Sequence, residues 1–216
     1  MTAQSFPIAD PRHPGNEEAL LPPEVGRLGM WVFLATEVLF FGGLGLAYFY
    51  GRTHWPQGFA IASRHTDVVL GTVNTALLLT SSAVIALAHA CSEYAPRRHW
   101  AARLLWLTAA LGIAFLAVKG VEYRKEWYEH LVPRLGFSLG EEGAELFFWL
   151  YFVMTGLHAV HLAIGIAGVS VFAWGCSSAR PWARANRIEA MALYWHFVDV
   201  VWIFLYPMIY LVDRHS

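Results

Sequence analysis

Five long apolar runs constrain this 216-residue chain more than any other feature. A transmembrane helix needs about 20 mostly apolar residues, and lipid offers an open backbone no hydrogen-bond partners. Strands of a membrane barrel would be shorter and would alternate polar with apolar residues, which these runs do not do. The runs cover 29–50, 68–90, 104–121, 146–175 and 190–212. The sequence therefore predicts an all-α polytopic membrane protein, with a five-helix transmembrane bundle over 28–212 after a polar N-terminal tail over 1–27.

Charge supports this interpretation and suggests an orientation. Only 14% of the residues are charged, against about 25% in soluble domains, and no basic run indicates a nucleic-acid partner. The loops 92–103 and 177–187 are basic, whereas acids collect in the loop predicted over 122–145. Because basic loops favour the cytoplasmic side, we expect the N-terminus in the cytoplasm and the C-terminus outside. Three formally charged residues fall inside the apolar runs, namely Glu37, Lys119 and Asp199.

Glu37 stands alone in the apolar stretch "WVFLATEVLFFGG". A carboxylate at mid-bilayer costs about 2.5–3.5 kcal/mol on insertion scales, so this side chain must be neutral, paired or turned toward protein. It could belong to a proton or ion relay. A neutral carboxyl bonded to a neighbouring helix is the favoured alternative, because burial favours the uncharged acid. We predict that Glu37 lies inside the bundle beside His158 or His161.

Two histidines in "TGLHAVHLAIG", His158 and His161, share one helical face at three-residue spacing. A bis-histidine metal site would use such a face, but the same helix offers no cysteine or second carboxylate. Haem-binding bundles place histidine pairs about 20 Å apart along the helix axis, and this chain lacks that spacing. We therefore expect hydrogen bonds between helices here, and neither a metal nor another cofactor bound to this chain.

The last apolar run, "YWHFVDVVWIFLYP", carries His196 and Asp199 on one face. They could transfer a proton, or they could form a His–Asp lock that holds the last helix in the bundle. Lys119 lies near the end of the third run. It could snorkel toward the membrane surface or pair with Glu122 one turn further on.

A stripe of small residues at four-residue spacing runs along the fourth apolar segment. Small side chains at this period let helices approach closely in lipid. We therefore expect this helix to pack against a neighbour along the stripe. The stripe consists of Thr155, Ala159, Ala163 and Ala167.

Several stretches together resemble subunit III of the haem–copper oxidases. They are "LGMWVFLATEVLFF", "GTVNTALLLTSS", "KGVEY", "FFWLYFVMTGLHAVHLAIG" and "YWHFVDVVWIFLY", and they occur in the family's order from about Leu28 to Leu211. Members often carry two further N-terminal helices, and this chain is similar to the five-helix form. It departs from the pattern at Thr36, where serine is commoner, and at Lys119, where longer members often have glutamine. A further departure is Pro207, in an ending similar to that of the subunit-III-like proteins of nitric oxide reductases.

The resemblance implies a non-redox accessory subunit of a respiratory terminal oxidase that couples O2 reduction to proton pumping. It implies packing on subunit I beside subunit II, support of proton uptake, haem and copper in the partner rather than in this chain, and a bound phospholipid. It also implies the inner membrane of a bacterium. Glu37 matches the family's reactive buried glutamate. The remaining matches to polar positions of the family are Glu122, His158, His161, His196 and Asp199.

Three alternatives stay open at this point. The first is a subunit-III-like accessory protein of a nitric oxide reductase, to which the ending around Pro207 is similar. The second is a stand-alone proton-coupled transporter, which would show inverted repeats and broken helices; neither is visible in the sequence. The third is a haem-bearing membrane anchor, which the histidine spacing disfavours.

Overall fold

The computed structural model describes residues 23–93, 98–133, 137 and 139–211, and every regular element within them is a helix. Five of the six helices are long and apolar enough to cross a membrane, which confirms the predicted all-α, five-span architecture. The sixth, α2, is a short helix that the apolar pattern did not predict. The helices are α1 (Pro23–His54), α2 (Pro56–Arg64), α3 (Val68–Ser92), α4 (Arg98–Tyr128), α5 (Ala144–Ser177) and α6 (Ala185–Tyr210).

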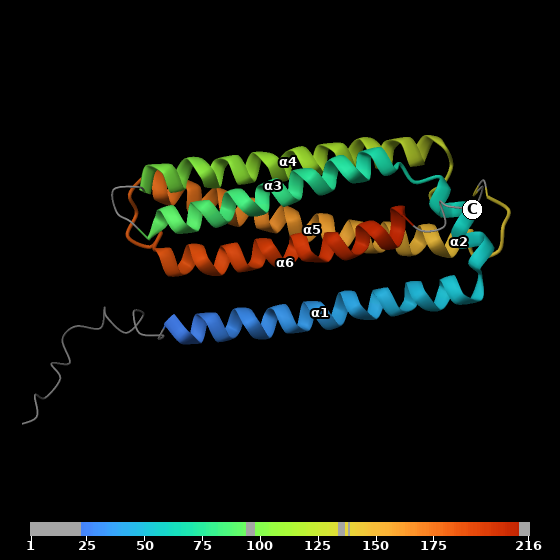
Figure 1. Ribbon diagram of the computed structural model, residues 1–216, viewed down its shortest axis with the longest axis horizontal. Helices are drawn as coiled ribbons and strands as arrows, with labels where there is room; N and C mark the ends of the chain where they lie inside the picture. The colour runs from blue at the N-terminus through green and yellow to red at the C-terminus, as the bar shows by residue number, and fades with distance from the viewer. Residues whose placement is uncertain (1–22, 94–97, 134–136, 138, 212–216) are drawn as a thin grey trace, which may run out of the picture.

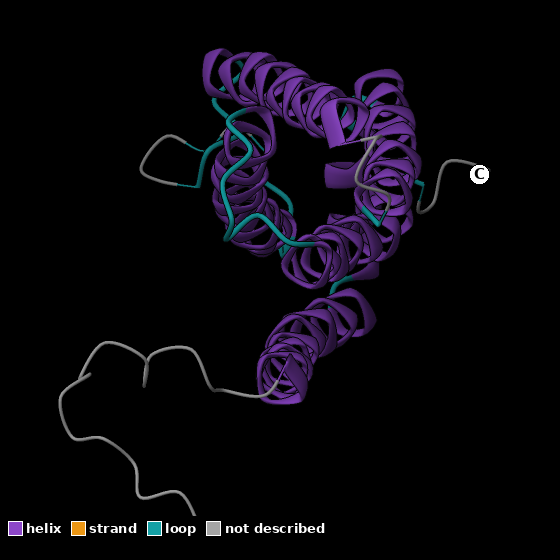
Figure 2. Ribbon diagram, turned by 90° about the vertical axis from the view of Figure 1, so that its left-hand side faces the viewer, coloured by secondary structure: helices purple, strands orange, loops and turns teal. Residues whose placement is uncertain are grey.

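Helices α3 to α6 form a four-helix bundle, and α1 lies along its outside (Figure 1). Figure 2, viewed along the bundle, shows the same separation of one helix from the other four. The core of the bundle is aromatic, and Trp195, Trp202 and Phe115 are fully buried in it. Gly112 makes this packing feasible, because a Cβ atom there would lie 2.9 Å from both Ile166 and Trp195. The glycine thus lets α4, α5 and α6 approach one another around a large indole.

Helix α1 touches the bundle along one narrow face. The Tyr48 hydroxyl donates a hydrogen bond to the carbonyl oxygen of Met208 on α6, and the ring of Phe33 stacks on that of Tyr194. Most other large side chains of α1 point away from the bundle, so that Leu39, for example, is 77% exposed. In a membrane protein these apolar side chains meet lipid or another subunit.

Helix α3 begins at a capped end. The Oδ1 atom of Asp67 accepts hydrogen bonds from the backbone N–H groups of Val69 and Leu70, at 3.1 and 3.3 Å. Its Oδ2 atom lies 3.2 Å from the Lys125 Nζ on α4. Burial raises the pKa of the Asp67 carboxyl, but the hydrogen bonds from Leu70 and Lys125 outweigh burial and hold this pKa below its ordinary value. Asp67 therefore both starts α3 and ties it to the far end of α4.

Helix α4 is longer than its apolar run. It continues to Tyr128, so the loop predicted to begin at Glu122 begins only after that residue. Lys119 and Glu122 consequently lie within the helix and face its neighbours. The extension follows from the polar residues at its end, whose side chains bond to one another or to α3 instead of interrupting the helix.

The small-residue stripe on α5 packs inside this chain only at its start, where Thr155 is buried and its hydroxyl lies beside the Tyr123 hydroxyl of α4. Ala163 and Ala167 are exposed, whereas His158, Leu162 and Gly165 are buried. Trp195 and Tyr194 of α6 lie over Gly165, where a Cβ atom would come within 3.2 to 3.3 Å of their rings. The close approach between α5 and α6 thus depends on glycine and not on the predicted stripe.

Candidate functional site

The most polar part of the bundle is a buried ring of four side chains from α4, α5 and α6. The Lys119 ammonium donates to the Glu122 Oε2 at 2.9 Å, to the Tyr151 hydroxyl at 2.9 Å and to the Tyr210 hydroxyl at 2.6 Å. Lys119 is 2% exposed and Glu122 1%. Lys119 therefore pairs with Glu122, as one of the two predicted alternatives proposed, and does not snorkel toward water.

The two tyrosines close the ring. Each hydroxyl accepts from Lys119 and donates to the Oε1 of Glu122, over 3.2 Å from Tyr151 and 2.6 Å from Tyr210. The ammonium also lies 4.7 and 5.3 Å from the centroids of these two aromatic rings, within the range of a cation–π attraction. Both charges of the ion pair are thus bonded several times, which a buried ion pair needs if it is not to destabilise the fold.

Glu126, one turn after Glu122 on α4, adds a further acid beside the ring. Its side chain is 3% exposed, and neither carboxylate oxygen has a hydrogen-bond partner among the described residues. The sequence analysis did not single out Glu126, because its spacing from Lys119 exceeds one helical turn. Two buried acids beside one lysine give this region more acidic than basic groups.

A second polar contact joins α1 to α5. The Glu37 Oε2 lies 3.2 Å from the His161 Nε2, with both side chains about one-sixth exposed. The His161 Nδ1 lies 2.9 Å from the carbonyl oxygen of Leu157, so this nitrogen must carry a proton. The facing atoms are close enough for an ion pair, but they do not form a well-aligned hydrogen bond, and the Glu37 Oε2 has no hydrogen-bond partner among the described residues.

His158 and His161 do not act together. His158 is buried in the four-helix core, where its ring lies 5.5 Å from the Phe115 ring and 5.1 Å from the Trp202 ring. Neither of its nitrogens has a partner among the described residues. His161 instead faces α1. Of the two neighbours predicted for Glu37, the structure selects His161, and it places the contact at the edge of the bundle.

His196 and Asp199 are not bonded to each other. The His196 Nδ1 lies 2.7 Å from the Ser82 hydroxyl on α3. Ser82 also lies beside the carboxyl group of Asp199, but no well-formed hydrogen bond joins them, and within the described residues both Asp199 oxygens are unpartnered. The predicted His–Asp lock is therefore wrong as a pair. The three-residue spacing puts both side chains on the face of α6 that meets α3, where the Ser82 hydroxyl is hydrogen-bonded to His196.

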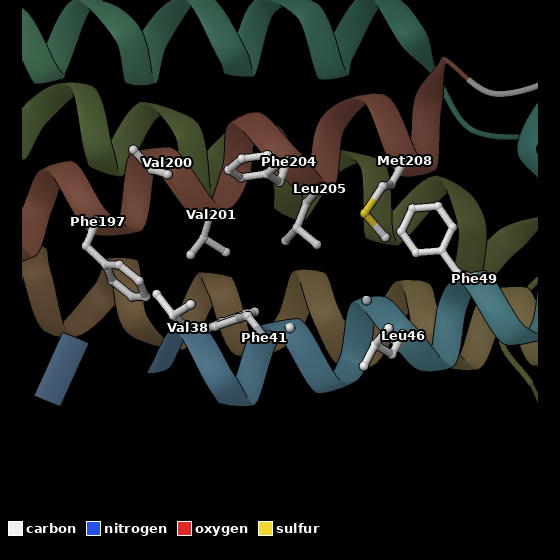
Figure 3. Close-up of a pocket in the computed structure, with 12 residues that line it drawn as sticks. Val38, Phe41, Leu46, Phe49, Phe197, Val200, Val201, Phe204, Leu205 and Met208 are labelled. Carbon is white, nitrogen blue, oxygen red and sulfur yellow. The ribbon is translucent and has the colours of Figure 1, made fainter. Parts of the chain in front are cut away.

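An apolar groove runs between α1 and α6 (Figure 3). It encloses about 330 Å³. Val38, Phe41 and Leu46 line it from α1, and Leu205 and Met208 from α6. Gly45 lies in the α1 wall, and a Cβ atom there would still be 4.0 Å from Met208. All of the residues that line this groove are apolar.

None of the polar groups forms an evident metal site. Across the described ranges, no three or more histidine, cysteine, aspartate or glutamate side chains come together closely enough to hold a metal ion. What the described residues offer instead is a buried ion-pair ring, one close contact between Glu37 and His161, and several buried polar groups without a hydrogen-bond partner, among them Asn74, Glu126, His158 and Asp199.

Comparison with known proteins places this arrangement in a family. The profile of "Cytochrome c oxidase subunit III" matches residues 24–213, which is nearly the whole described chain. The chain belongs to the cytochrome c oxidase subunit III family. It is a haem–copper oxidase subunit III and an integral membrane protein, and the family is that of an accessory subunit of the oxidase.

Relatives of this subunit III come from distant organisms. Cytochrome c oxidase subunit 3 of Thermostichus vulcanus is 35% identical over 89% of this chain and 90% of its own length. The Bacillus subtilis protein of the same name is 29% identical over 98% of this chain and 95% of its own. A heme-copper oxidase subunit I+III of Aeropyrum pernix is 30% identical over 88% of this chain, which spans 23% of that longer protein.

Besides Glu126, the sequence analysis missed Tyr151 and Tyr210. Tyrosine is common in membrane helices near the interface, so neither residue stood out. A usable signal was present, because Lys119 and Glu122 one turn apart need further buried partners. Identifying which tyrosines supply them required the packing of α4 against α5 and α6.

Proposed function

We propose that this chain packs on subunit I of a respiratory haem–copper oxidase, beside subunit II, in the inner membrane of a bacterium. In this role it stabilises the catalytic subunit and supports its proton uptake, while haem and copper are bound by the partner. The observation that carries the proposal is the Aeropyrum pernix relative, in which a sequence like this one is part of a protein named subunit I+III. Fusion of two subunits in one chain supports placing them side by side.

The polar residues suggest how the chain supports proton uptake. We propose that Glu37 on α1 and His161 on α5, which lie 3.2 Å apart, share one proton; most other large side chains of α1 are exposed. A proton-sharing pair at such a surface can exchange its proton with a neighbouring subunit without leaving a net charge in lipid. Glu122, His196 and Asp199 lie deeper in the bundle, and we assign them a structural role.

The groove between α1 and α6 supports the proposal that the chain holds a phospholipid. Its lining is apolar, so an acyl chain would fill it without an unpaired polar contact. A bound chain would also fill the space that separates α1 from the bundle.

We also propose that the N-terminal end of α1 faces the cytoplasm, because the loops 92–103 and 177–187 are basic.

Gentle purification of the tagged full-length chain from its native membranes tests the subunit proposal. We expect co-purification with a larger membrane subunit that carries haem and copper, seen as a Soret band and as protein masses. Assays of O2 reduction and of NO reduction by this complex distinguish the oxidase from the nitric oxide reductase alternative. Isolation of a monodisperse chain without a haem-bearing partner would contradict the proposal.

A variant at Glu37 tests whether this residue is an obligatory part of the path of proton uptake. Glu37→Gln keeps an amide that can donate to a neutral His161, so we expect assembly to be intact and turnover to change little. A hydrophobic carbodiimide should label the wild type and not this variant. Thr36→Ala is the matched control, since Thr36 bonds only to its own helix at the carbonyl of Phe33. Complete loss of O2 reduction in Glu37→Gln would instead make Glu37 part of an obligatory path.

A further inference from the structure

The buried acid Glu126 lies outside the hydrogen bonds that join Lys119, Glu122, Tyr151 and Tyr210. Its side chain is 3% exposed, and within the described part of the chain neither of its oxygens has a hydrogen-bond partner. The Tyr151 hydroxyl lies beside this carboxyl group, but no well-formed hydrogen bond joins them. An ionised carboxylate without partners is costly away from water, so the protonation state of Glu126 has to be explained separately from that of Glu122.

Glu122 is the ionised acid of this region. It accepts three hydrogen bonds, over 2.9 Å from the Lys119 ammonium and over 3.2 and 2.6 Å from the hydroxyls of Tyr151 and Tyr210. Hydrogen bonds donated to a carboxyl group favour its ionised form. One carboxylate therefore balances the one ammonium, and the geometry identifies that carboxylate as Glu122.

The charges around Glu126 disfavour a second negative charge. The basic group that acts on Glu126 is Lys119, and Glu122 already neutralises it. Glu122 and Glu129 are both acids, and a nearby carboxylate opposes the ionisation of another. A proton on Glu126 removes the uncompensated charge. Among the described residues, the titratable groups that face Glu126 are Lys119, Glu122, Tyr123 and Glu129 on α4, Tyr151 on α5 and Tyr210 on α6.

Glu126 is buried, but it lies close to the end of its helix. Helix α4 ends at Tyr128, which is 74% exposed. Lys125, the preceding residue, is also exposed and pairs with Asp67 at the start of α3. The backbone N–H of Leu131 donates to the carbonyl oxygen of Glu126 over 3.0 Å, so the chain turns back at this point. Glu126 thus lies within one helical turn, about 5.4 Å, of the polar end of α4, where water can reach.

We propose that Glu126 is a proton-binding site, and that it holds one exchangeable proton beside the ionised pair of Lys119 and Glu122. The proton comes from water where α4 ends and returns to water there, so one O–H bond forms or breaks at the carboxyl group and no electron moves. The protonated carboxyl can donate a hydrogen bond to the Tyr151 hydroxyl, whose oxygen also accepts from Lys119. The proposal does not depend on a contact with subunit I or on the contact between Glu37 and His161.

Infrared difference spectroscopy of the purified full-length chain tests the proposal. A protonated carboxyl group gives a carbonyl stretch that an ionised carboxylate lacks. The wild-type spectrum minus that of Glu126→Gln at neutral pH should show this band at one carboxyl per chain, and the band should shift in D2O because the proton exchanges. Glu129→Gln is the matched control. Glu129 is exposed three residues further on, and an exposed carboxyl is ionised at neutral pH, so its removal should abolish no such band.

A second variant keeps a carboxyl group at this position. Glu126→Asp should replace the wild-type band with one at a different frequency, and this comparison tests the proposal even where Glu126→Gln does not fold. Sodium and potassium salts distinguish a bound proton from a bound metal cation. We expect the band to be the same with and without these salts. A band that either salt abolishes would overturn the proposal, as would wild-type spectra that match those of the Glu126 variants in the region of this band.

Discussion

Replacing Lys119 with methionine should strongly destabilise the chain, because it breaks a buried ion pair from one side. The methionine keeps the length and the apolar stem of lysine but removes three hydrogen bonds, to Glu122, Tyr151 and Tyr210. Glu122 then remains as a carboxylate that is 1% exposed, with two hydroxyl donors and no cation. Breaking a buried ion pair from one side costs about 3–5 kcal/mol.

This cost can be measured as a loss of thermal stability. About 1 kcal/mol lowers the Tm by roughly 2–4 °C in chains of 150–250 residues, so Lys119→Met should lower it by roughly 6–20 °C. The measurement is the loss of helical circular dichroism of the purified chain in mild detergent. Lys125→Met is the control on the same helix. Its ion pair with Asp67 is partly exposed, so the change should cost at most about 1 kcal/mol.

The double variant decides whether the ion pair is the cause. Glu122→Gln leaves a buried ammonium and should cost about as much as Lys119→Met. Lys119→Met with Glu122→Gln removes both charges and leaves an amide that can still bond to the hydroxyls of Tyr151 and Tyr210. It should therefore be more stable than either single variant, with a coupling energy of about 2 kcal/mol or more. Additive losses in the double variant, or a Lys119→Met chain as stable as the control, would refute this reasoning.

Three further perturbations have expected outcomes. Asp67→Ala should cost about 1 kcal/mol in thermal unfolding, the usual loss for a helix cap. The pKa of Asp67 is below its ordinary value in the folded chain, so the ionised carboxylate stabilises the fold. This stabilisation should be complete above about pH 4 and should be lost as the pH falls through the folded pKa, which a series of thermal melts at different pH values would show. His196→Ala should cost about 1–3 kcal/mol by stranding Ser82, and its effect should add to that of Asp199→Ala; strong coupling would restore the His–Asp lock.

The five spans could be predicted because apolar length is a local property of the sequence. The pairing of Lys119 with Glu122 was also accessible, since three-residue spacing puts both on one face of a helix. Spacing alone predicted the wrong partner for His196. Two side chains on one face of a helix point in the same direction, but the spacing does not show which residue of a neighbouring helix each of them contacts. Ser82 comes from a helix more than a hundred residues earlier, and only the packed bundle identifies it.

The small-residue stripe of α5 illustrates the same limit. Its period correctly indicated a helix that can approach a neighbour, but two faces of α5 carry small residues. Gly165 is buried under the rings of α6, whereas Ala163 is exposed. The choice between these faces depends on where the indole of Trp195 fits, which is a property of two helices together.

The placement of α1 has a consequence for the order of events during synthesis. Tyr48 bonds to Met208, which follows it by 160 residues in the chain. At about 5–20 residues per second, roughly 8–30 seconds pass between the synthesis of these two positions. Helix α1 therefore enters the bilayer before the part of α6 that it contacts has been made, and Glu37 meets lipid before His161 exists. A protonated Glu37 would let α1 remain in lipid during this interval without carrying a charge into the bilayer.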